Sequence, residues 1–445
     1  MGRLFGTDGI RGVANVDLTP ELAFKVGRAA AHVLAGDGNR FVIGRDTRLS
    51  GEMLEAALVA AICSTGGRVL RAGILPTPAV AFLGRAHGAV AIAISASHNP
   101  VEDNGIKFFA PDGFKLPEAV EDAIEASLER HDLRRAAGEE IGRTEELPDA
   151  VERYVDFVAS LATVPPVGLR VVVDCAFGAA CPVAPRLWER LGATVIPINA
   201  EPDGGRINVD CGSTHPEVIR AAVLAHGADV AFAHDGDADR VIAVDETGRI
   251  VDGDALMGLC ALHLAAHSRL PGKVVVATVM SNLGLEIALR RSGLALERTR
   301  VGDRYVLERM RELDAPLGGE QSGHIIFLEH ATTGDGLVTS VQVVNVMMET
   351  GRRLSELAAP IERFPQVLRN VRVNSRDGVE AHPAVQAAVG EAERRLQGRG
   401  RVLVRPSGTE PLVRVMVEAE DAGEAESVAA SLAEVIGRTF GAPGS

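Results

Sequence analysis

Three aspartates at alternate positions, Asp235, Asp237 and Asp239, directly follow the apolar run "VAFAH". Three carboxylates so close together repel one another unless a cation offsets them, and all-oxygen ligands suit Mg²⁺ or Ca²⁺. A calcium-binding EF-hand loop is excluded, because its sixth position needs glycine and here holds Arg240. Mg²⁺ usually completes its shell with water and phosphate oxygens. The loop therefore predicts a magnesium site that meets a phosphate, and a solvated acidic turn is the plain alternative.

A second polar loop, "SASHNP", follows the apolar run "AVAIAI" and carries Ser97. Neither a G-x-S-x-G sequence nor a serine–histidine–aspartate arrangement is recognisable, so a serine hydrolase is not indicated. A serine that carries a phosphoryl group would need a divalent metal and cationic neighbours. Asn104-Gly105 predicts a turn that brings Lys107 back toward Ser97 on a returning strand. Ser95 is the competing serine, and a serine that merely caps the strand is the alternative.

The third loop, "LGGEQSGHIIF", places Glu320, Ser322 and His324 at alternate positions. Such spacing lets the three side chains project from one side of the chain. The carboxylate and the hydroxyl suit recognition of sugar hydroxyls or an amine, and the histidine suits acid or base chemistry near neutral pH. A glycine-rich hairpin without chemistry is an equally good interpretation.

A fourth loop, "RPSGTEPLVRV", gathers groups that bind a phosphate dianion. A guanidinium, two hydroxyls and free backbone N–H groups together form an anion nest. The residues are Arg405, Ser407, Gly408 and Thr409, with Arg414 on the following strand as support. An ordinary Pro/Gly turn is the alternative.

Single arginines elsewhere add weaker signals. Arg11 stands in the glycine-flanked "FGTDGIRG", where a cation could stabilise a transferring phosphate. Arg304 precedes a helical pattern in "VGDRYV" and could contact a substrate. Arg45 and Arg48 in "GRDTRLSG" are better explained as structural ion pairs around a turn.

Strands alternating with helices must position these loops. Short Val/Ile/Ala-rich runs alternate with helical patterns, and this rhythm predicts βαβ units. One such pattern follows Ser50, which we expect to cap the helix. The polar stretch near 150 and the turn near 252 divide the chain, and the last segment carries two adjacent strands between helices. We therefore predict an α/β protein with three similar mixed α/β domains and a C-terminal α+β domain around a central cleft, over 1–150, 151–252, 253–365 and 366–445.

Composition excludes several classes of partner. The 445-residue chain has a net charge of −14 and only 4% aromatic residues, which argues against nucleic acid and anionic membranes as partners. The five scattered cysteines show no metal-ligand spacing and indicate reduced thiols. No signal sequence or membrane-length apolar run is recognisable, so we expect a cytoplasmic protein.

Together the motifs "FGTDGIRG", "ISASHNP", "DGDADR", "GGEQSGH" and "RPSGTEP" resemble the α-D-phosphohexomutase superfamily, in the family's order and over essentially the whole chain. The loop "INVDCGSTHPE" and Gln321 resemble its glucosamine branch more than its mannose/glucose branch. The resemblance implies four domains around one cleft, a small-molecule sugar phosphate as partner, and a homodimer.

The resemblance also implies roles for individual residues. The family's phosphoserine corresponds to Ser97, and its single Mg²⁺ would be held by that phosphate with Asp235, Asp237 and Asp239. Its sugar-selecting pair corresponds to Glu320 and Ser322, and its phosphate anchor to Arg405, Ser407, Gly408 and Thr409. Its acid/base and charge-stabilising residues correspond to Lys107, His324 and Arg11.

The implied reaction moves a phosphoryl group between O6 and O1 of glucosamine phosphate through a hexose 1,6-bisphosphate, toward UDP-N-acetylglucosamine and cell-wall precursors. The same mechanism acting on mannose or glucose phosphates is the nearest alternative. A metal-dependent phosphatase would instead release inorganic phosphate, and a regulator on this fold would bind the sugar phosphate without turnover.

Overall fold

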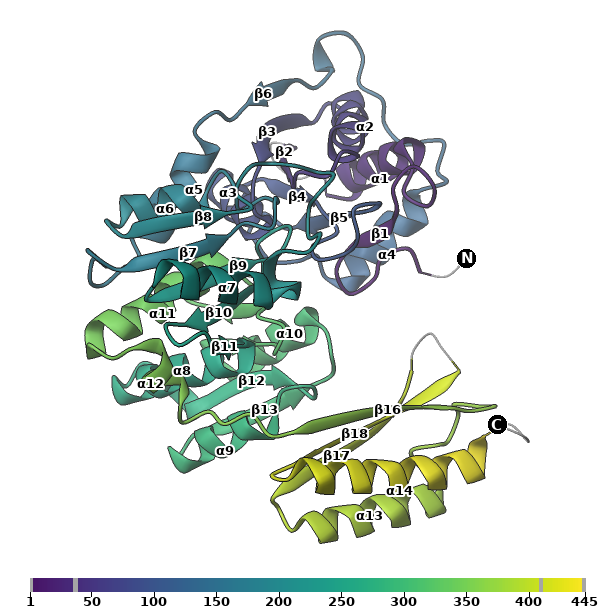
Figure 1. The fold of residues 1–445 in the computed structure, drawn as a ribbon. Helices are drawn as coiled ribbons and strands as arrows, with labels where there is room; N and C mark the ends of the chain where they lie inside the picture. Colours follow the sequence, from purple (N-terminus) through teal and green to yellow (C-terminus); the bar gives the residue numbers. More distant parts are fainter. Residues whose placement is uncertain (1–2, 35–38, 408–410, 442–445) are drawn as a thin grey trace. The chain divides into compact units, whose positions relative to one another are not determined.

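The computed structural model describes residues 3–34, 39–407 and 411–441. The chain divides into two compact units: residues 1–280 with 292–360, and residues 281–291 with 361–445. We describe each unit by itself. Four sheets follow one another along the chain, and each is built from consecutive strands (Figure 1).

The first sheet has six strands in the order β1-β5-β4-β2-β3-β6, and its core β2, β3 and β4 run parallel. Its strands are β1 (Ile10–Val13), β2 (Arg40–Arg45), β3 (Arg68–Ile74), β4 (Val90–Ile94), β5 (Asp103–Phe109) and β6 (Thr144–Glu146). The associated helices are α1 (Pro20–Val33), α2 (Gly51–Ser64), α3 (Thr77–His87) and α4 (Glu118–Ser127). Buried side chains such as Phe41, Ile43 and Ile92 form the core beneath them.

The second sheet has the order β11-β10-β9-β7-β8 and is also mixed, with β9 and β10 antiparallel. Its strands are β7 (Arg170–Asp174), β8 (Thr194–Ile198), β9 (Val230–His234), β10 (Val241–Asp245) and β11 (Ile250–Val251). Its helices are α5 (Ala150–Ala159), α6 (Ala184–Arg190) and α7 (Pro216–His226). Trp188 stacks on Phe232 with ring centroids 5.5 Å apart, as expected of a packing residue.

The third sheet has the order β13-β12-β14-β15. Its strands are β12 (Val274–Thr278), β13 (Ala295–Thr299), β14 (Leu317–Gly319) and β15 (Ile325–Phe327). The helices of this stretch are α8 (Gly253–Ala266), α9 (Leu283–Arg291), α10 (Asp303–Leu313), α11 (Gly336–Thr350) and α12 (Leu354–Ala358). Helix α9 belongs to the second compact unit, where Glu418 accepts a hydrogen bond from the Leu283 N–H.

The fourth sheet is antiparallel, in the order β16-β18-β17, and confirms the predicted α+β segment. Its strands are β16 (Gln366–Arg372), β17 (Gly400–Pro406) and β18 (Leu412–Ala419). Helices α13 (Pro383–Leu396) and α14 (Ala422–Phe440) cover one face of it (Figure 1). The predicted fold class, three mixed α/β sheets followed by an α+β segment, is confirmed.

Two local predictions are wrong. Asn104-Gly105 is not a turn, because both residues lie inside β5, where Gly105 pairs with Arg11 of β1. A Cβ at Gly105 would stand 2.5 Å from the Ser95 carbonyl oxygen, so glycine is needed there for close packing. Ser50 occupies the N-cap position of α2, but its hydroxyl accepts a hydrogen bond from Asn104 and does not cap the helix.

Two further sequence features have outcomes in the structure. All five cysteines lie within the described residues and are free thiols. Among the described residues, no helix is both long enough and apolar enough to cross a membrane.

Candidate active site

The loop after β4 directs Ser97 at the aspartates. Ser97 has a φ of 54°, and its hydroxyl donates a 2.5 Å hydrogen bond to Oδ2 of Asp235. The competing Ser95 has a different role: its hydroxyl donates to Asp46 (2.6 Å) and accepts from the Ser97 N–H (2.9 Å). Of the two serines, Ser97 therefore meets the carboxylates, and Ser95 supports its backbone.

Arg48 fixes the shape of this loop. Its side chain is fully buried and forms an ion pair with Asp46 at 3.0 Å. The guanidinium also donates to the carbonyl oxygens of Ser97 (3.0 Å) and Asn99 (2.8 Å). Arg45, in turn, pairs with two glutamates of α2. The structural ion pairs predicted for both arginines are confirmed, and Arg48 also holds the backbone of the Ser97 loop.

The three aspartates form one buried cluster, which we call the aspartate cluster (Asp235, Asp237 and Asp239). One carboxylate oxygen from each lies within 4.8 Å of the others. The Lys107 ammonium lies 2.8 Å from Asp237 and 3.4 Å from Asp239, so the lysine does return to this site on β5. Thr77, at the start of α3, donates a 2.6 Å hydrogen bond to Asp237.

Unequal surroundings separate the pKa values of these carboxyls. Burial alone would raise the pKa of Asp237, but the Lys107 ammonium and two hydrogen bonds hold it well below its usual range. Burial raises the pKa of Asp235 and Asp239, and the neighbouring carboxylates raise it further. Carboxylates that disfavour one another's charge are the arrangement that a bound cation relieves.

The orphaned oxygens of the cluster fit a divalent cation. Within the described part of the chain, Oδ1 of Asp237 and Oδ1 of Asp239 are buried without a hydrogen-bond partner. Such oxygens are costly to bury unless a metal or another donor takes them. Glu246, which an EF-hand would need as a ligand, instead accepts hydrogen bonds from Ser355, so the EF-hand remains excluded. The all-carboxylate donor set suits Mg²⁺.

Segments from the rest of this unit hold the aspartate loop in place. The carbonyl oxygen of Asp237 accepts from the N–H of Thr77 (3.0 Å), and that of Ala238 accepts from Gly336 at the start of α11 (3.0 Å). Gly236 has to be glycine, because a Cβ there would lie 2.6 Å from the carbonyl oxygen of Ser97. Serine loop and aspartate loop therefore pack backbone against backbone.

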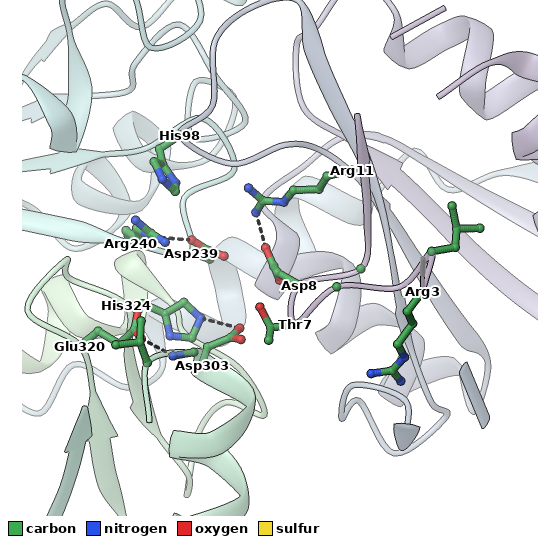
Figure 2. Close-up of a pocket in the computed structure, with 15 residues that line it drawn as sticks. Arg3, Thr7, Asp8, Arg11, His98, Asp239, Arg240, Asp303, Glu320 and His324 are labelled. Carbon is green, nitrogen blue, oxygen red and sulfur yellow. Dashed lines mark hydrogen bonds and ion pairs between the residues drawn. The ribbon is translucent and has the colours of Figure 1, made fainter. Parts of the chain in front are cut away.

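A pocket of about 440 Å³ opens beside this centre (Figure 2). Its lining includes Asp239 of the cluster and His98, the neighbour of Ser97. Arg11 of β1 and Asp8, just before that strand, lie across from Glu320 and other side chains of the third α/β segment. Ser97 itself is 1% exposed, so its neighbours, and not its own surface, connect it to the pocket.

Asp8, Lys115 and Asp303 were not predicted, although they join the two sides of the pocket. Asp8 contacts Lys107 at 3.0 Å and Lys115 at 2.5 Å, and also pairs with Arg11. Lys115 in turn forms an ion pair with Asp303. Burial opposes the charge on Asp8, but the three cations hold its pKa well below its usual range. The glycine-flanked "TDG" was the available signal for Asp8; no local signal marks the other two.

The loop predicted to recognise a sugar is a hairpin turn between β14 and β15. The hairpin interpretation is therefore confirmed, and the sugar-recognition role stays a prediction. Glu320 and His324 line the pocket, whereas Ser322 is not among the described residues that do. The Ser322 hydroxyl donates a 3.4 Å hydrogen bond to Oε2 of Glu320. The Gly334 N–H donates to Nε2 of His324 (3.2 Å), and Nδ1 of this histidine is buried without a partner among the described residues. Nε2 also lies 3.6 Å from Oδ2 of Asp303.

Burial and the cationic side chains near Ser97 keep His98 neutral. Burial, together with the charges of Arg240 and Arg11, lowers the pKa of His98 to about 4. Nδ1 of His98 lies 3.2 Å from the Ser97 hydroxyl. A neutral imidazole beside this serine adds no positive charge to a site that already holds several cations.

Arg304 is placed differently from the prediction. It does not appear among the described residues that line the pocket, and its guanidinium makes a buried two-pronged ion pair with Glu121 (2.5 and 3.0 Å). Its neighbour Asp303 lines the pocket instead.

In the second compact unit, Arg405 and Arg414 stand directly opposite each other on β17 and β18. We call them the arginine pair. Burial lowers the pKa of Arg405, and Arg414 lowers it further. Like charges across two strands are destabilising unless an anion lies between them. The Ser407 carbonyl oxygen accepts a 2.6 Å hydrogen bond from Arg376, whereas Gly408 and Thr409 lie outside the described residues.

Comparison with protein families finds four matches in chain order. Residues 2–135, 152–248 and 252–364 match the phosphoglucomutase/phosphomannomutase alpha/beta/alpha domains I, II and III, and residues 368–435 match the C-terminal domain of the same family.

Whole-chain relatives agree with the family match. The chain is 60% identical over 440 residues to a phosphoglucosamine mutase of Moorella thermoacetica, which covers 98% of this chain and 99% of that one. A phosphoglucomutase/phosphomannomutase family protein of Burkholderia thailandensis has a similar structure, with a TM-score of 0.82, 24% identity and coverage of 98% and 97%. An N-acetylphosphoglucosamine mutase of Aspergillus fumigatus, solved with GlcNAc-6P and magnesium, gives a TM-score of 0.69 at 20% identity, over 97% and 95% of the two chains.

Proposed function

This chain belongs to the phosphoglucomutase/phosphomannomutase family, and we propose that it is a phosphoglucosamine mutase, which interconverts glucosamine 6-phosphate and glucosamine 1-phosphate. The observation that carries the proposal is the 2.5 Å contact of the Ser97 hydroxyl with a buried carboxylate cluster that a lysine also reaches. A serine that only caps a strand needs neither.

In the proposed cycle, Ser97 carries a phosphoryl group. The bond from phosphorus to Oγ breaks, a bond to O1 of glucosamine 6-phosphate forms, and the O1 proton ends on Ser97. The resulting hexose 1,6-bisphosphate then reorients in the site, so that its 6-phosphoryl group faces Ser97. Its 6-phosphoryl group returns to Oγ, the serine proton ends on O6, and glucosamine 1-phosphate leaves.

Charge stabilisation is the main contribution of the protein to phosphoryl transfer. One Mg²⁺ held by the aspartate cluster and the serine phosphate would neutralise charge on the transferring group. The pKa of Lys107 is raised well above its usual range, because its carboxylate neighbours outweigh the effect of burial. Lys107 therefore acts as a fixed cation beside Ser97, and Arg11 adds a second cation from the pocket wall.

Sugar and phosphate recognition are assigned to the pocket and the second unit. Glu320 accepts hydrogen bonds from the amine and a hydroxyl of glucosamine, Ser322 adds a hydroxyl, and His324 forms a hydrogen bond with a sugar oxygen. The arginine pair, with Ser407, Gly408 and Thr409, binds the phosphate that is not reacting. Arg304, held by its ion pair with Glu121, positions its chain neighbour Asp303 on the pocket wall.

The product would supply UDP-N-acetylglucosamine for cell-wall precursors, which places the enzyme in the cytoplasm, and we propose a homodimer as its assembly. The names of its relatives support glucosamine as the sugar. The same centre could serve mannose or glucose phosphates, since only the Glu320 loop would have to differ.

The test compares turnover of glucosamine, glucose and mannose 6-phosphates with Mg²⁺ and a trace of hexose 1,6-bisphosphate. We expect clear preference for glucosamine 6-phosphate. Preference for a neutral hexose would overturn the assignment of Glu320, and release of inorganic phosphate without isomerisation would overturn the mutase assignment itself.

A further inference from the structure

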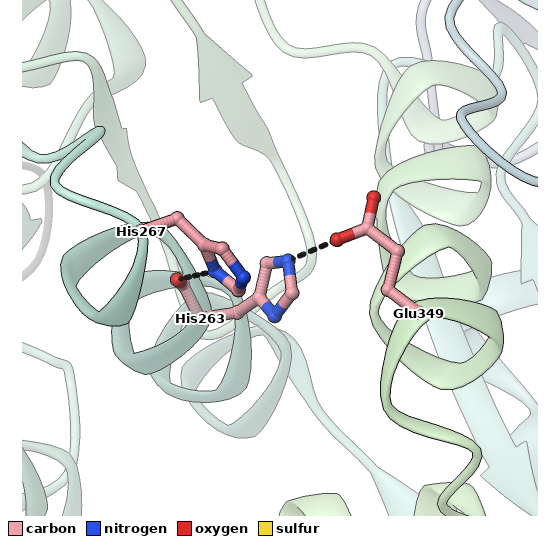
Figure 3. Close-up of side chains that lie close together, drawn as sticks. All are labelled: His263, His267 and Glu349. Atoms are coloured by element: carbon pink, nitrogen blue, oxygen red, sulfur yellow. Dashed lines mark hydrogen bonds and ion pairs between the residues drawn. The ribbon is translucent and has the colours of Figure 1, made fainter.

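We propose that His263, His267 and Glu349 form a second metal site, which takes a transition-metal dication such as Zn²⁺ (Figure 3). We call these residues the α8–α11 site. One ligand atom of each lies within 4.8 Å of the others. Ligand atoms around a tetrahedral Zn²⁺ lie about 3.3 Å apart, so small side-chain rotations complete the geometry.

Helix geometry places the two histidines together. His263 lies in the last turn of α8, and His267 follows four positions later at its C-cap, with ring centroids 4.3 Å apart. Histidines at positions i and i+4 of a helix share one face and can bind one metal ion. Nδ1 of His267 donates to the His263 carbonyl oxygen (2.9 Å), which leaves the lone pair on Nε2 for a metal.

The third ligand comes from another helix and is oriented from outside the site. Oε2 of Glu349, in the last turn of α11, lies 2.8 Å from Nε2 of His263. Its other oxygen, Oε1, accepts a 2.5 Å hydrogen bond from the Thr163 hydroxyl, in the segment after α5. This contact leaves Oε2 directed at the histidines. A metal between them would take the Nε2 lone pair of His263, whose proton then resides on Nδ1.

The surroundings leave room for a metal-bound water. A cavity of about 10 Å³, on the order of one water molecule, is lined by His263, Glu349 and Thr163. Arg269 also lines it, but its guanidinium lies 3.6 Å from Glu329, which offsets its charge. The side chain of His263 is 11% exposed and that of Glu349 is 25% exposed, so an ion can reach them from solvent.

This site is separate from the aspartate cluster in place and in chemistry. Helix α11 begins beside the cluster at Gly336 and carries Glu349 thirteen residues later, about 20 Å along its axis. Imidazole ligands select Zn²⁺, Co²⁺ or Ni²⁺, whereas an all-carboxylate set selects Mg²⁺. A metal at the α8–α11 site would join two helices and the segment after α5, and so stabilise this unit.

The experiment titrates Zn²⁺ and, separately, Co²⁺ into the full chain, stripped of metals and then supplied with excess Mg²⁺. We expect one ion to bind per chain, with visible absorption bands for Co²⁺. His267→Gln should weaken binding at least tenfold, and Thr163→Val by about tenfold through loss of the carboxylate orientation. The matched control is His226→Gln, an exposed histidine at the end of α7.

A melting series separates a metal site from a plain ion pair. Zn²⁺ should raise the melting temperature of the wild type and of His226→Gln by about 3 °C or more, and leave that of His267→Gln unchanged. Mutase activity should be the same in all three. Equal Zn²⁺ affinity in His267→Gln and wild type, or no binding of Zn²⁺ by the wild type, would overturn the proposal.

Discussion

The aspartate cluster and the arginine pair both face phosphate in the proposed cycle, yet they are built in opposite ways. In the cluster, buried carboxylates lie beside a cation of opposite charge, Lys107, which is 2.8 Å from Asp237. In the arginine pair, two like charges stand opposite each other on β17 and β18. Neighbours of opposite charge keep the groups of the cluster in fixed positions before substrate arrives, and two cations side by side favour an anion that comes and goes. Catalysis needs the first property, and reversible phosphate binding needs the second.

The strongest test of the proposed catalytic centre removes the hydroxyl of Ser97, which would accept the phosphoryl group. Ser97→Ala should lower kcat by on the order of 10⁴-fold or more, because no other group can form the covalent intermediate. Ser95→Ala is the matched control, since its hydroxyl only bridges Asp46 and the Ser97 N–H. We expect about a tenfold loss for the control. Substantial turnover by Ser97→Ala in the coupled mutase assay would contradict the phosphoserine mechanism.

Removal of one carboxylate charge from the aspartate cluster should have the next largest effect on kcat. Asp239→Asn should lower kcat by about 10²- to 10³-fold and raise the Mg²⁺ concentration needed for half-maximal activity. Asp239 lies on the pocket wall, so the change removes charge where the transferring group and its metal would meet. Asp203→Asn, a surface aspartate paired with Arg206, controls for the substitution. An unchanged Mg²⁺ requirement in Asp239→Asn would contradict the metal assignment.

The sequence predicted the parts of the centre that are local. Asp235, Asp237 and Asp239 were recognisable because they follow a buried strand at alternate positions, and Ser97 because polar residues follow another such strand. Fold class was equally accessible, since the alternation of strands and helices is periodic along the chain. These predictions depend only on residues near one another in sequence.

What the sequence could not predict depends on distant pairs. Lys107 and Asp237 are 130 positions apart, and Lys115 and Asp303 are 188 apart, so no local pattern marks either contact. The Asn104-Gly105 prediction failed for the same reason. A strand from the N-terminus packs against Gly105, and that neighbour cannot be seen from the dipeptide alone.

Asp335 extends the comparison, because it is buried and, within the part of the chain that the structure describes, its carboxylate is bonded by a tyrosine and backbone N–H groups and not by a lysine. Asp335 caps α11 and accepts hydrogen bonds from the Tyr154 hydroxyl (2.7 Å) and two backbone N–H groups. Burial raises the pKa of Asp335 to about 6. A folded-state pKa above the unfolded value means that the stability it contributes is present in acid and is lost as pH rises through about 6.

Asp335→Asn removes this titration and retains an oxygen that can cap the helix. Relative to wild type, the free energy of unfolding of the variant should therefore increase by up to about 3 kcal/mol between pH 4 and pH 7. Urea unfolding of both proteins at the two pH values measures the difference. A difference that stays constant or decreases with pH would show that burial does not raise the pKa of this carboxyl.

Substitution in the arginine pair should have the smallest effect. It tests whether the pair binds phosphate without taking part in phosphoryl transfer. Arg405→Met should raise KM for the sugar phosphate by about 10- to 100-fold, the cost of one charge-assisted hydrogen bond, with a smaller change in kcat. Arg395→Met, an exposed arginine of α13 in the same unit, is the matched control and should leave KM unchanged. A fall in kcat as large as that of Asp239→Asn would mean that the pair belongs to the catalytic centre and serves phosphoryl transfer as well as binding.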